Sequence, residues 1–345
     1  MTKLIPYVAL SCTLLPSVSY ATNIFDDNRH TLELSGRLEA QIAQGDDSFT
    51  PDGDTRGRIT GRLAIEAQRT LSDFENSQLV GKLEWQVRTE TNDSKLDSGE
   101  DLDARYAFMG IENDVWGQLV FGRTKNPLYQ VMKITDKYKN FTPNVYNYGL
   151  SSIDTSFVYN RQDSTLQYEI KQGDILFQSA YVLGNGENTR LDKGMMVSLT
   201  DSYRFDSITL SPAIAASRYK RIESNSDTSR KQHDQILTGI SLDVNNFNLG
   251  LTASYTHIEQ DNGEDNYLGL DSVVSYQWNR TKILAGYSLL DERDMDIEEK
   301  KGWRIEGQWR LAKRTYLSLT YTKAIASKNV ESSAHGTTLG LRYDF

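Results

Sequence analysis

The stretch GWRIEGQWRL, residues 302–311, alternates without exception between two kinds of side chain. Its odd positions are apolar or small: Trp303, Ile305, Gly307, Trp309 and Leu311. Its even positions are charged or polar: Arg304, Glu306, Gln308 and Arg310. Successive side chains of a β-strand point to opposite faces of the sheet, so this period of two predicts a strand with one apolar and one polar face.

Further stretches along the chain follow the same rule. They include TLELSGRLEAQIAQ (31–44), RITGRLAIEAQ (58–68), VGKLEWQVRTE (80–90), RQDSTLQYEIK (161–171), TYLSLTYT (315–322) and TTLGLRYDF (337–345). We count about sixteen such strands between Thr31 and Phe345, each about ten to fourteen residues long. Strands of soluble domains usually run about five or six residues, whereas a tilted strand that crosses a bilayer needs about ten.

The connections between these strands are of two kinds, which alternate along the chain. Tight turns are predicted at 172–174, 206–207, 245–246 and 279–280, where Gly, Asp, Ser and Asn supply turn chemistry. Longer, polar and acidic connections are predicted at 45–56, 91–103, 220–234 and 291–301. This alternation is expected if every strand reverses direction and one end of the sheet carries all the large loops.

Bulk composition excludes a helical membrane protein, because mean hydropathy is −0.55, 25% of residues are charged, and no apolar run approaches the ~20 residues of a spanning helix. The first 21 residues read as a secretory signal peptide cut after Ala21. The only cysteine, Cys12, lies in this leader, and its acylation in a lipoprotein is the alternative. A net charge of −9 disfavours nucleic acid as a partner.

Two folds can explain the alternation: a soluble β-sandwich with a dry core, or a membrane barrel. The leader, the strand length, the even strand count and the terminal aromatic Phe345 favour the barrel. An open edge in hydrocarbon would leave backbone groups unpaired at a cost of several kcal/mol each, so the sheet must close. We therefore predict an all-β fold, a transmembrane antiparallel β-barrel over residues 22–345, with lipid outside and water inside.

One connection, residues 124–155, has no clean alternation and is about thirty residues long. Its many Tyr and Phe residues favour an ordered segment folded into the lumen, which a sixteen-stranded barrel can hold. A surface flap is the alternative.

Four arginines fall on the polar, inward side of their strands: Arg37, Arg62, Arg105 and Arg161. Arg105 is assigned inward because Tyr106, Phe108 and Gly110 are expected to face outward. The four could form structural ion pairs, or they could form a basic wall opposite Asp136 in the inserted segment.

The motifs SGRLEAQ, ITGRLAIEAQ, DARYAFMGIEN, WGQLVFGR followed by NPLYQVMKITD, RQDSTLQYEI and the ending LGLRYDF occur in order along the chain. This series resembles the trimeric general porins of Gram-negative outer membranes. The resemblance implies a sixteen-stranded barrel, a homotrimer, and a third loop that narrows the lumen. It also implies that Arg62, Arg105 and Arg161 are wall arginines of the constriction, that Arg37 is a basic position beside them, and that Asp136 is an acidic residue of the loop.

The loop departs from the family pattern after Asp136. The chain reads KYKNFTPNVYNYG, with Asn140 where a second carboxylate is expected and with Lys133, Lys137 and Lys139 nearby. This basic loop puts the usual cation preference of the family in doubt.

We therefore expect an outer-membrane channel for passive diffusion of ions and small hydrophilic solutes, with no cofactor and no enzymatic activity. The expected partners are outer-membrane lipid, lipopolysaccharide and the solutes. One alternative is a sugar-selective channel lined by Tyr138, Tyr146 and Tyr148; another is an adhesin that acts through its acidic loops. The four histidines, His30, His233, His257 and His335, are expected to be solvated, and Asp46, Asp47, Asp52 and Asp54 are interpreted as a solvated loop rather than a Ca²⁺ or Mg²⁺ site.

Overall fold

A computed structural model describes residues 22–27, 29–46, 55–90, 102–140, 161–184, 191–221, 230–260, 263–292, 300–325 and 335–345. Within these ranges it contains eighteen strands and one short helix, α1 (Tyr129–Met132). The strands are β1 (Thr22–Asp26), β2 (His30–Gly45), β3 (Arg56–Thr70), β4 (Ser77–Glu90), β5 (Leu102–Asn113), β6 (Gly117–Lys125), β7 (Arg161–Gln172), β8 (Ile175–Leu183), β9 (Leu191–Thr200), β10 (Tyr203–Phe205), β11 (Ile208–Arg221), β12 (Arg230–Val244), β13 (Phe247–Gln260), β14 (Gly263–Trp278), β15 (Thr281–Glu292), β16 (Lys300–Ala312), β17 (Thr315–Ile325) and β18 (His335–Asp344).

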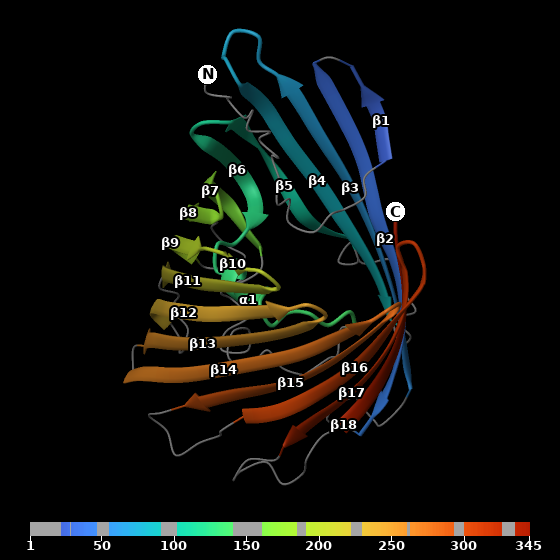
Figure 1. The fold of residues 1–345 in the computed structure, drawn as a ribbon. Helices are drawn as coiled ribbons and strands as arrows, with labels where there is room; N and C mark the ends of the chain where they lie inside the picture. Colours follow the sequence, from blue (N-terminus) through green and yellow to red (C-terminus); the bar gives the residue numbers. More distant parts are fainter. Residues whose placement is uncertain are drawn as a thin grey trace, which may run out of the picture.

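These strands form one closed antiparallel barrel with sixteen positions in its wall (Figure 1). Each strand pairs with the next along the chain, from β2–β3 through β8–β9, then β9–β11 and on to β17–β18. The pairing of β18 with β2 closes the ring. β10 pairs with residues 208–210 of β11, and β9 pairs with residues 213–221 of the same strand. β9 and β10 therefore occupy one wall position between them. The predicted fold class and strand count are therefore confirmed.

The two ends of the chain complete one wall position between them. β18 pairs with residues 37–45 of β2, and β1 pairs with residues 31–34 of the same strand. Between them, Phe345 exchanges two backbone hydrogen bonds with Gly36, at 2.9 and 3.0 Å. The seam is thus hydrogen-bonded along the described length of β2, as a barrel in hydrocarbon requires.

The predicted separation of apolar and polar faces is confirmed along the wall. In the opening stretch, Ile305 is 45% exposed and its neighbour Glu306 is 0% exposed. The same contrast separates Leu339 from Thr338, and Ile59 from Thr60. Apolar side chains therefore cover the outside, and polar side chains crowd the inside.

Tight turns lie at one end of the barrel, as predicted. Asp206, Asn245 and Asn279 have φ angles of 49°, 51° and 50°, and Gly173 has a φ of 61°. Positive φ is what two-residue hairpin turns require, and Asn, Asp and Gly reach it at low cost. One predicted loop, 220–234, was too long: β12 already begins at Arg230, because residues 232–234 pair with β11.

Strand β5 corrects one face assignment. Tyr106 pairs with inward Glu84, and Phe108 pairs with inward Lys82, whereas Met109 is 67% exposed on the outside. Tyr106, Phe108 and Gly110 therefore face inward, and the prediction that they face outward was wrong. The cause is a β-bulge: Glu84 pairs with Tyr106 and Trp85 with Ala104, which leaves Arg105 as an extra residue that also reaches the lumen.

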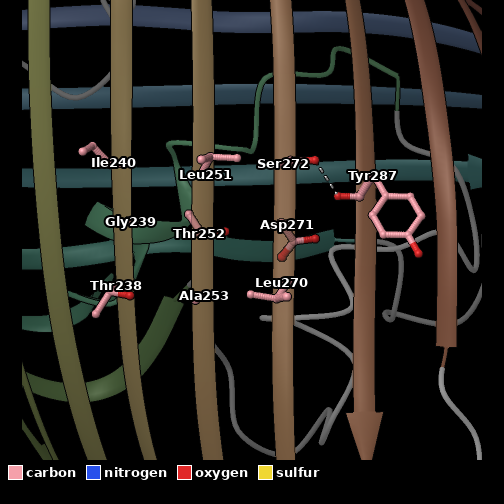
Figure 2. Close-up of a pocket in the computed structure, with 10 residues that line it drawn as sticks. All are labelled: Thr238, Gly239, Ile240, Leu251, Thr252, Ala253, Leu270, Asp271, Ser272 and Tyr287. Atoms are coloured by element: carbon pink, nitrogen blue, oxygen red, sulfur yellow. Dashed lines mark hydrogen bonds between the residues drawn. The ribbon is translucent and has the colours of Figure 1, made fainter.

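A shallow depression of about 500 Å³ lies on the outer surface of β12–β15. Figure 2 shows the small Ser272 of β14 between the larger Leu251 of β13 and Tyr287 of β15, and the small Thr238 and Ala253 also line the depression. Leu251 and Tyr287 belong to the exposed, outward set, so the depression faces away from the lumen. Separately, no helix among the described residues is long and apolar enough to cross a membrane.

Candidate functional site

Three of the four predicted arginines are neighbours on the inner face of the wall, and two of them share one amide partner. Arg37 on β2 and Arg62 on β3 are direct cross-strand partners. The Gln86 side-chain oxygen on β4 accepts from Arg62 at 2.9 Å and from Arg105 at 2.7 Å. Each of these strands supplies one inward residue at the same height, so a basic surface runs across β2, β3, β4 and β5.

Carboxylates hold the two outer members of this surface. Arg37 donates to Asp344 at 2.7 Å, and Arg342 donates to the same carboxylate at 3.0 Å. Arg105 donates to Glu84 at 2.6 Å. The guanidinium groups are therefore oriented by fixed partners on the wall, which keeps them from folding back on the backbone.

Arg161 extends the same surface through an aromatic ring. Its guanidinium carbon lies 4.6 Å from the centre of the Tyr106 ring, and the Lys82 ammonium lies 4.9 Å from that centre. Lys125, the cross-strand partner of Arg161, lies 3.2 Å from the centre of the Tyr129 ring. The structure thus places all four predicted arginines on one wall and adds Lys82, Tyr106 and Lys125 to it.

Residues 126–140, the described part of the long connection, pack against the inner side of the opposite wall. Leu128, Val131, Met132 and Ile134 are buried against Ala180 and Val182 of β8, Met196 of β9, Ala213, Ala215 and Tyr219 of β11 and Leu237 of β12. Asn126 begins the segment: its side chain accepts from the Leu128 amide at 2.9 Å and donates to the Tyr219 hydroxyl at 2.8 Å. Figure 1 shows α1 enclosed by the strands.

Inward glycines of the wall make room for this segment. A Cβ on Gly239 would lie 2.7 Å from Ile134, and one on Gly250 would lie 2.5 Å from the Ile134 carbonyl oxygen. A Cβ on Gly286 would collide with the Tyr138 hydroxyl, and one on Gly340 with the Asn140 side chain. These four glycines lie on β12, β13, β15 and β18, so the seat of the segment extends across much of the barrel.

The end of the described segment is held by a buried polar network. Glu306 on β16 accepts from the backbone amides of Lys139 at 2.8 Å and Asn140 at 3.2 Å. Its carboxylate also accepts from the Thr320 hydroxyl at 2.6 Å. The Asn140 side chain donates to Thr320 at 2.8 Å and accepts from the Ser318 hydroxyl at 2.6 Å. A carboxylate that accepts from two backbone amides is a strong, directional anchor.

Asp136 is exposed, and its carboxylate accepts from the Tyr129 hydroxyl at 3.0 Å. Burial, and then the negative charge of Asp136, raises the pKa of Tyr129 well above its ordinary value. The ring of Tyr129 also lies against Lys125, the cross-strand partner of Arg161. Tyr129 therefore links Asp136 to Lys125, at the edge of the basic wall.

Three lysines accompany Asp136 on the segment. Lys133 contacts the Gln130 side chain, and Lys139 lies 4.0 Å from the centre of the Tyr316 ring. Burial, followed by the positive charge of Arg342, lowers the pKa of Lys139 to about 8. Burial, and then the positive charge of Lys137, lowers the pKa of Lys133. Burial also lowers the pKa of Lys137, and the negative charges of Asp243 and Asp136 partly offset this effect.

One expectation about a single residue changes, and one aromatic residue of the segment is placed. His233 was expected to be solvated, but it is fully buried, with its ring centre 6.2 Å from that of Tyr219. The reason is that β12 begins at Arg230, so His233 lies in a strand and not in the predicted loop 220–234. Tyr138 is half-buried and packs toward the wall, with the Arg304 guanidinium 4.5 Å from its ring centre. Residues 1–21, residues 141–155, Tyr146 and Tyr148 lie outside the described residues.

Alternation predicts that Gln86 and Glu306 face inward, but it assigns them no role. Their partners, Arg105 and the amides of the 126–140 segment, come from other parts of the chain, so alternation alone could not single them out. Tyr106 was missed because the bulge reversed the face on which it was expected. Within the described residues, no group of three or more His, Cys, Asp or Glu side chains could hold a metal ion.

Comparison with known proteins identifies the family of this barrel. Residues 8–329 match a family model described as Gram-negative porin. Outer membrane protein U of Vibrio parahaemolyticus is 24% identical over 187 residues, a match that covers 52% of this chain and 50% of that protein. Porin-like protein L of Photobacterium profundum is 22% identical over 362 residues, covering 100% of both chains.

Solved structures show the same fold. OmpF of Salmonella typhi, solved in a complex with daunomycin, superposes with a TM-score of 0.76 at 16% identity, covering 94% of this chain and 100% of that one. A trimeric form of OmpT from Vibrio cholerae gives a TM-score of 0.70 at 16% identity, covering 92% and 100%. Because the family match extends over most of the sequence, the chain belongs to the family of Gram-negative porins.

Proposed function

We propose that Arg37, Arg62, Arg105, Arg161 and Asp136 set the electrostatics of the narrowest zone of this porin. As a Gram-negative porin, the protein is an outer-membrane β-barrel channel through which solutes diffuse passively. Passing ions and small hydrophilic solutes would meet these five side chains. Residues 124–155 are the segment that narrows the lumen in this proposal.

The observation that carries the proposal is the position of the arginines relative to the 126–140 segment. The arginines line one wall, held by Gln86, Glu84 and Asp344. The segment is anchored to the other wall by Glu306 and by an apolar cluster. Selectivity in a pore depends on its diameter and on the charges that line it, so fixed charges on both sides of a passage are what a selective zone needs.

The test compares two arginines, each ion-paired with one carboxylate. Arg105 lies inside the barrel with Glu84 at 2.6 Å, and Arg218 is 61% exposed with Asp234 at 2.7 Å. The reversal potential in a planar bilayer under a salt gradient should move toward cation preference for Arg105→Ala and stay unchanged for Arg218→Ala. An unchanged potential for Arg105→Ala would remove Arg105 from the selective zone.

Three further parts of the proposal concern assembly, export and chemistry. Homotrimerisation is supported by the family and by the trimeric form of OmpT from Vibrio cholerae. Residues 1–21 would be a cleaved signal peptide, and lipid, lipopolysaccharide and permeating solutes would be the partners. The channel would work without a cofactor and without catalytic turnover, because passive diffusion needs only an open, hydrated path.

A further inference from the structure

The segment opposite the arginine wall carries more positive than negative charge. Residues 126–140 contain three lysines and one aspartate, a net of +2. The remainder of the connection, residues 141–160, adds a single charged residue by sequence, Asp154. The chain as a whole is acidic, with a net charge of −9, so this basic segment does not follow from overall composition.

Several cations of this zone are held by neutral partners. Arg161 lies over the Tyr106 ring, Lys125 over the Tyr129 ring and Lys139 over the Tyr316 ring. Arg62 donates to the amide oxygen of Gln86. A ring face or an amide fixes the position of a cation without cancelling its charge, so the field of these groups remains available to a passing ion.

Three carboxylates of the zone, in contrast, are paired with cations or buried. Asp344 accepts from both Arg37 and Arg342, and Glu84 lies 2.6 Å from Arg105 and 3.9 Å from Lys82. Glu306 is fully buried beneath the segment and accepts from two of its backbone amides. Asp136 is the exposed carboxylate of the described segment, and three lysines flank it.

We propose that the narrowest zone of this porin is positive on both sides and that the channel conducts small anions in preference to cations. This inference rests on the proposed function, because it requires that the arginine wall and the 126–140 segment face each other across the path of the ions. A pore lined by one sign of charge concentrates counter-ions and excludes ions of the same sign. Small inorganic and carboxylate anions are the class of solute that such a zone admits.

The experiment measures chloride and potassium permeability from the reversal potential of the full-length porin in a planar bilayer under a potassium chloride gradient. The wild type should favour chloride. In about 0.1 M salt, removing one unit charge about 8 Å from the ion path changes the local concentrations of chloride and potassium about 1.5-fold in opposite directions, so their ratio changes about twofold per charge. The combined Lys133→Gln, Lys137→Gln and Lys139→Gln variant should therefore lower the chloride-to-potassium ratio roughly five- to tenfold.

Two further variants make the test specific. Asp136→Asn should raise the chloride-to-potassium ratio about twofold, because it removes the exposed carboxylate. A matched control replaces Lys171, Arg280 and Lys313, three exposed cations at the tight-turn end of the barrel, with glutamine. This control removes the same formal charge and should leave the ratio within its error.

The outcomes separate this inference from the proposed function. A wild-type channel that conducts but favours potassium overturns the anion preference and leaves the channel intact. A wild type that gives no ion current overturns the channel itself. If the triple lysine variant does not fold, the sign of the wild-type potential and the Asp136→Asn shift still decide. The preference should also weaken from about 0.1 M to about 1 M salt, because the screening length falls from ~10 Å to ~3 Å.

Discussion

The carboxylate of Glu306 on β16 accepts a hydrogen bond from the backbone amide of Lys139 at 2.8 Å, across 167 residues of sequence. The same carboxylate accepts from the amide of Asn140. A wall residue thereby fixes the backbone of the segment that carries the basic side chains. This buried acidic group therefore helps to set the position of the charges in the lumen.

Glu306→Ala should loosen the segment, because two backbone amides and the Thr320 hydroxyl lose their acceptor. Hydrogen bonds to a charged group contribute about 1.5–3 kcal/mol each, so the free energy of unfolding should fall by at least about 2 kcal/mol. Open-channel current noise should rise in single-channel recordings. Glu306→Gln keeps one acceptor oxygen and should show a smaller change.

Glu66→Gln is the control for the Glu306 variants. Glu66 is a wall carboxylate on β3 that pairs with Lys82 at 2.6 Å and does not contact the 126–140 segment in any described hydrogen bond or ion pair. Its replacement should leave current noise at the wild-type level. Equal noise in Glu306→Ala and the wild type would show that the amide contacts do not restrain the segment.

Gly340→Ala should displace the segment, because the new methyl group would meet the Asn140 side chain and would lie 3.0 Å from the Ser318 hydroxyl. Overpacking of this kind costs about 1–3 kcal/mol. The thermal unfolding midpoint in detergent should fall, and single-channel conductance should change.

A double-mutant cycle with Asn140→Ala tests whether the collision is the cause. Removing the Asn140 side chain vacates the space, so Gly340→Ala should cost less in that background, with a coupling of about 0.5–3 kcal/mol. Strict additivity of the two free-energy changes would contradict the contact.

Ion selectivity should depend on pH through Lys139, whose pKa is lowered to about 8. The ammonium group is charged below that pH and neutral above it, so anion preference should decline as pH rises from about 7 to about 9. Arg342, Asp344, Arg37 and Glu306 are the charged groups that act on it. The reversal potential measured across this range reports the change.

Lys139→Gln should flatten this pH profile. Lys133 and Lys137 should then give only a smaller change in selectivity at the high-pH end. Lys171→Gln, at the tight-turn end, should keep the wild-type profile. The same pKa shift links stability to pH. The unfolded chain binds the Lys139 proton more tightly than the folded protein does, so the contribution of Lys139 makes the free energy of unfolding rise as pH increases above about 8. A profile that is identical in Lys139→Gln and the wild type would exclude Lys139 as the titrating group.

Leu63→Lys should impair insertion, because Leu63 is 41% exposed on the outer face at the middle of β3. A lysine facing lipid near the bilayer midplane costs about 2–4 kcal/mol. The yield of folded barrel in vesicles, read from the shift between heated and unheated samples on a gel, should fall. Gln68 pairs with the inward residue Val80 on β4, so it also faces inward. The control variant Gln68→Lys should therefore fold normally.

Some features of the site could be read from local sequence, and others depended on strand register. Alternation in TLELSGRLEAQ was enough to point Arg37 inward, because a period of two assigns each residue to a face. The same rule failed for Tyr106, because the bulge at Arg105 shifts the register by one residue and reverses the faces beyond it. A bulge has no reliable signature within a single strand.

The sequence by itself determined that this protein is a barrel with an apolar outside and a polar inside, because that information is repeated every second residue in each strand. Tertiary structure alone decided which inward residues meet: Gln86 between Arg62 and Arg105, Arg161 against Tyr106, and Glu306 beneath Lys139. The physical reason is that a face is a local property of a strand. A contact across the lumen exists only after sixteen strands have closed in one register and the connecting segment has settled against the wall.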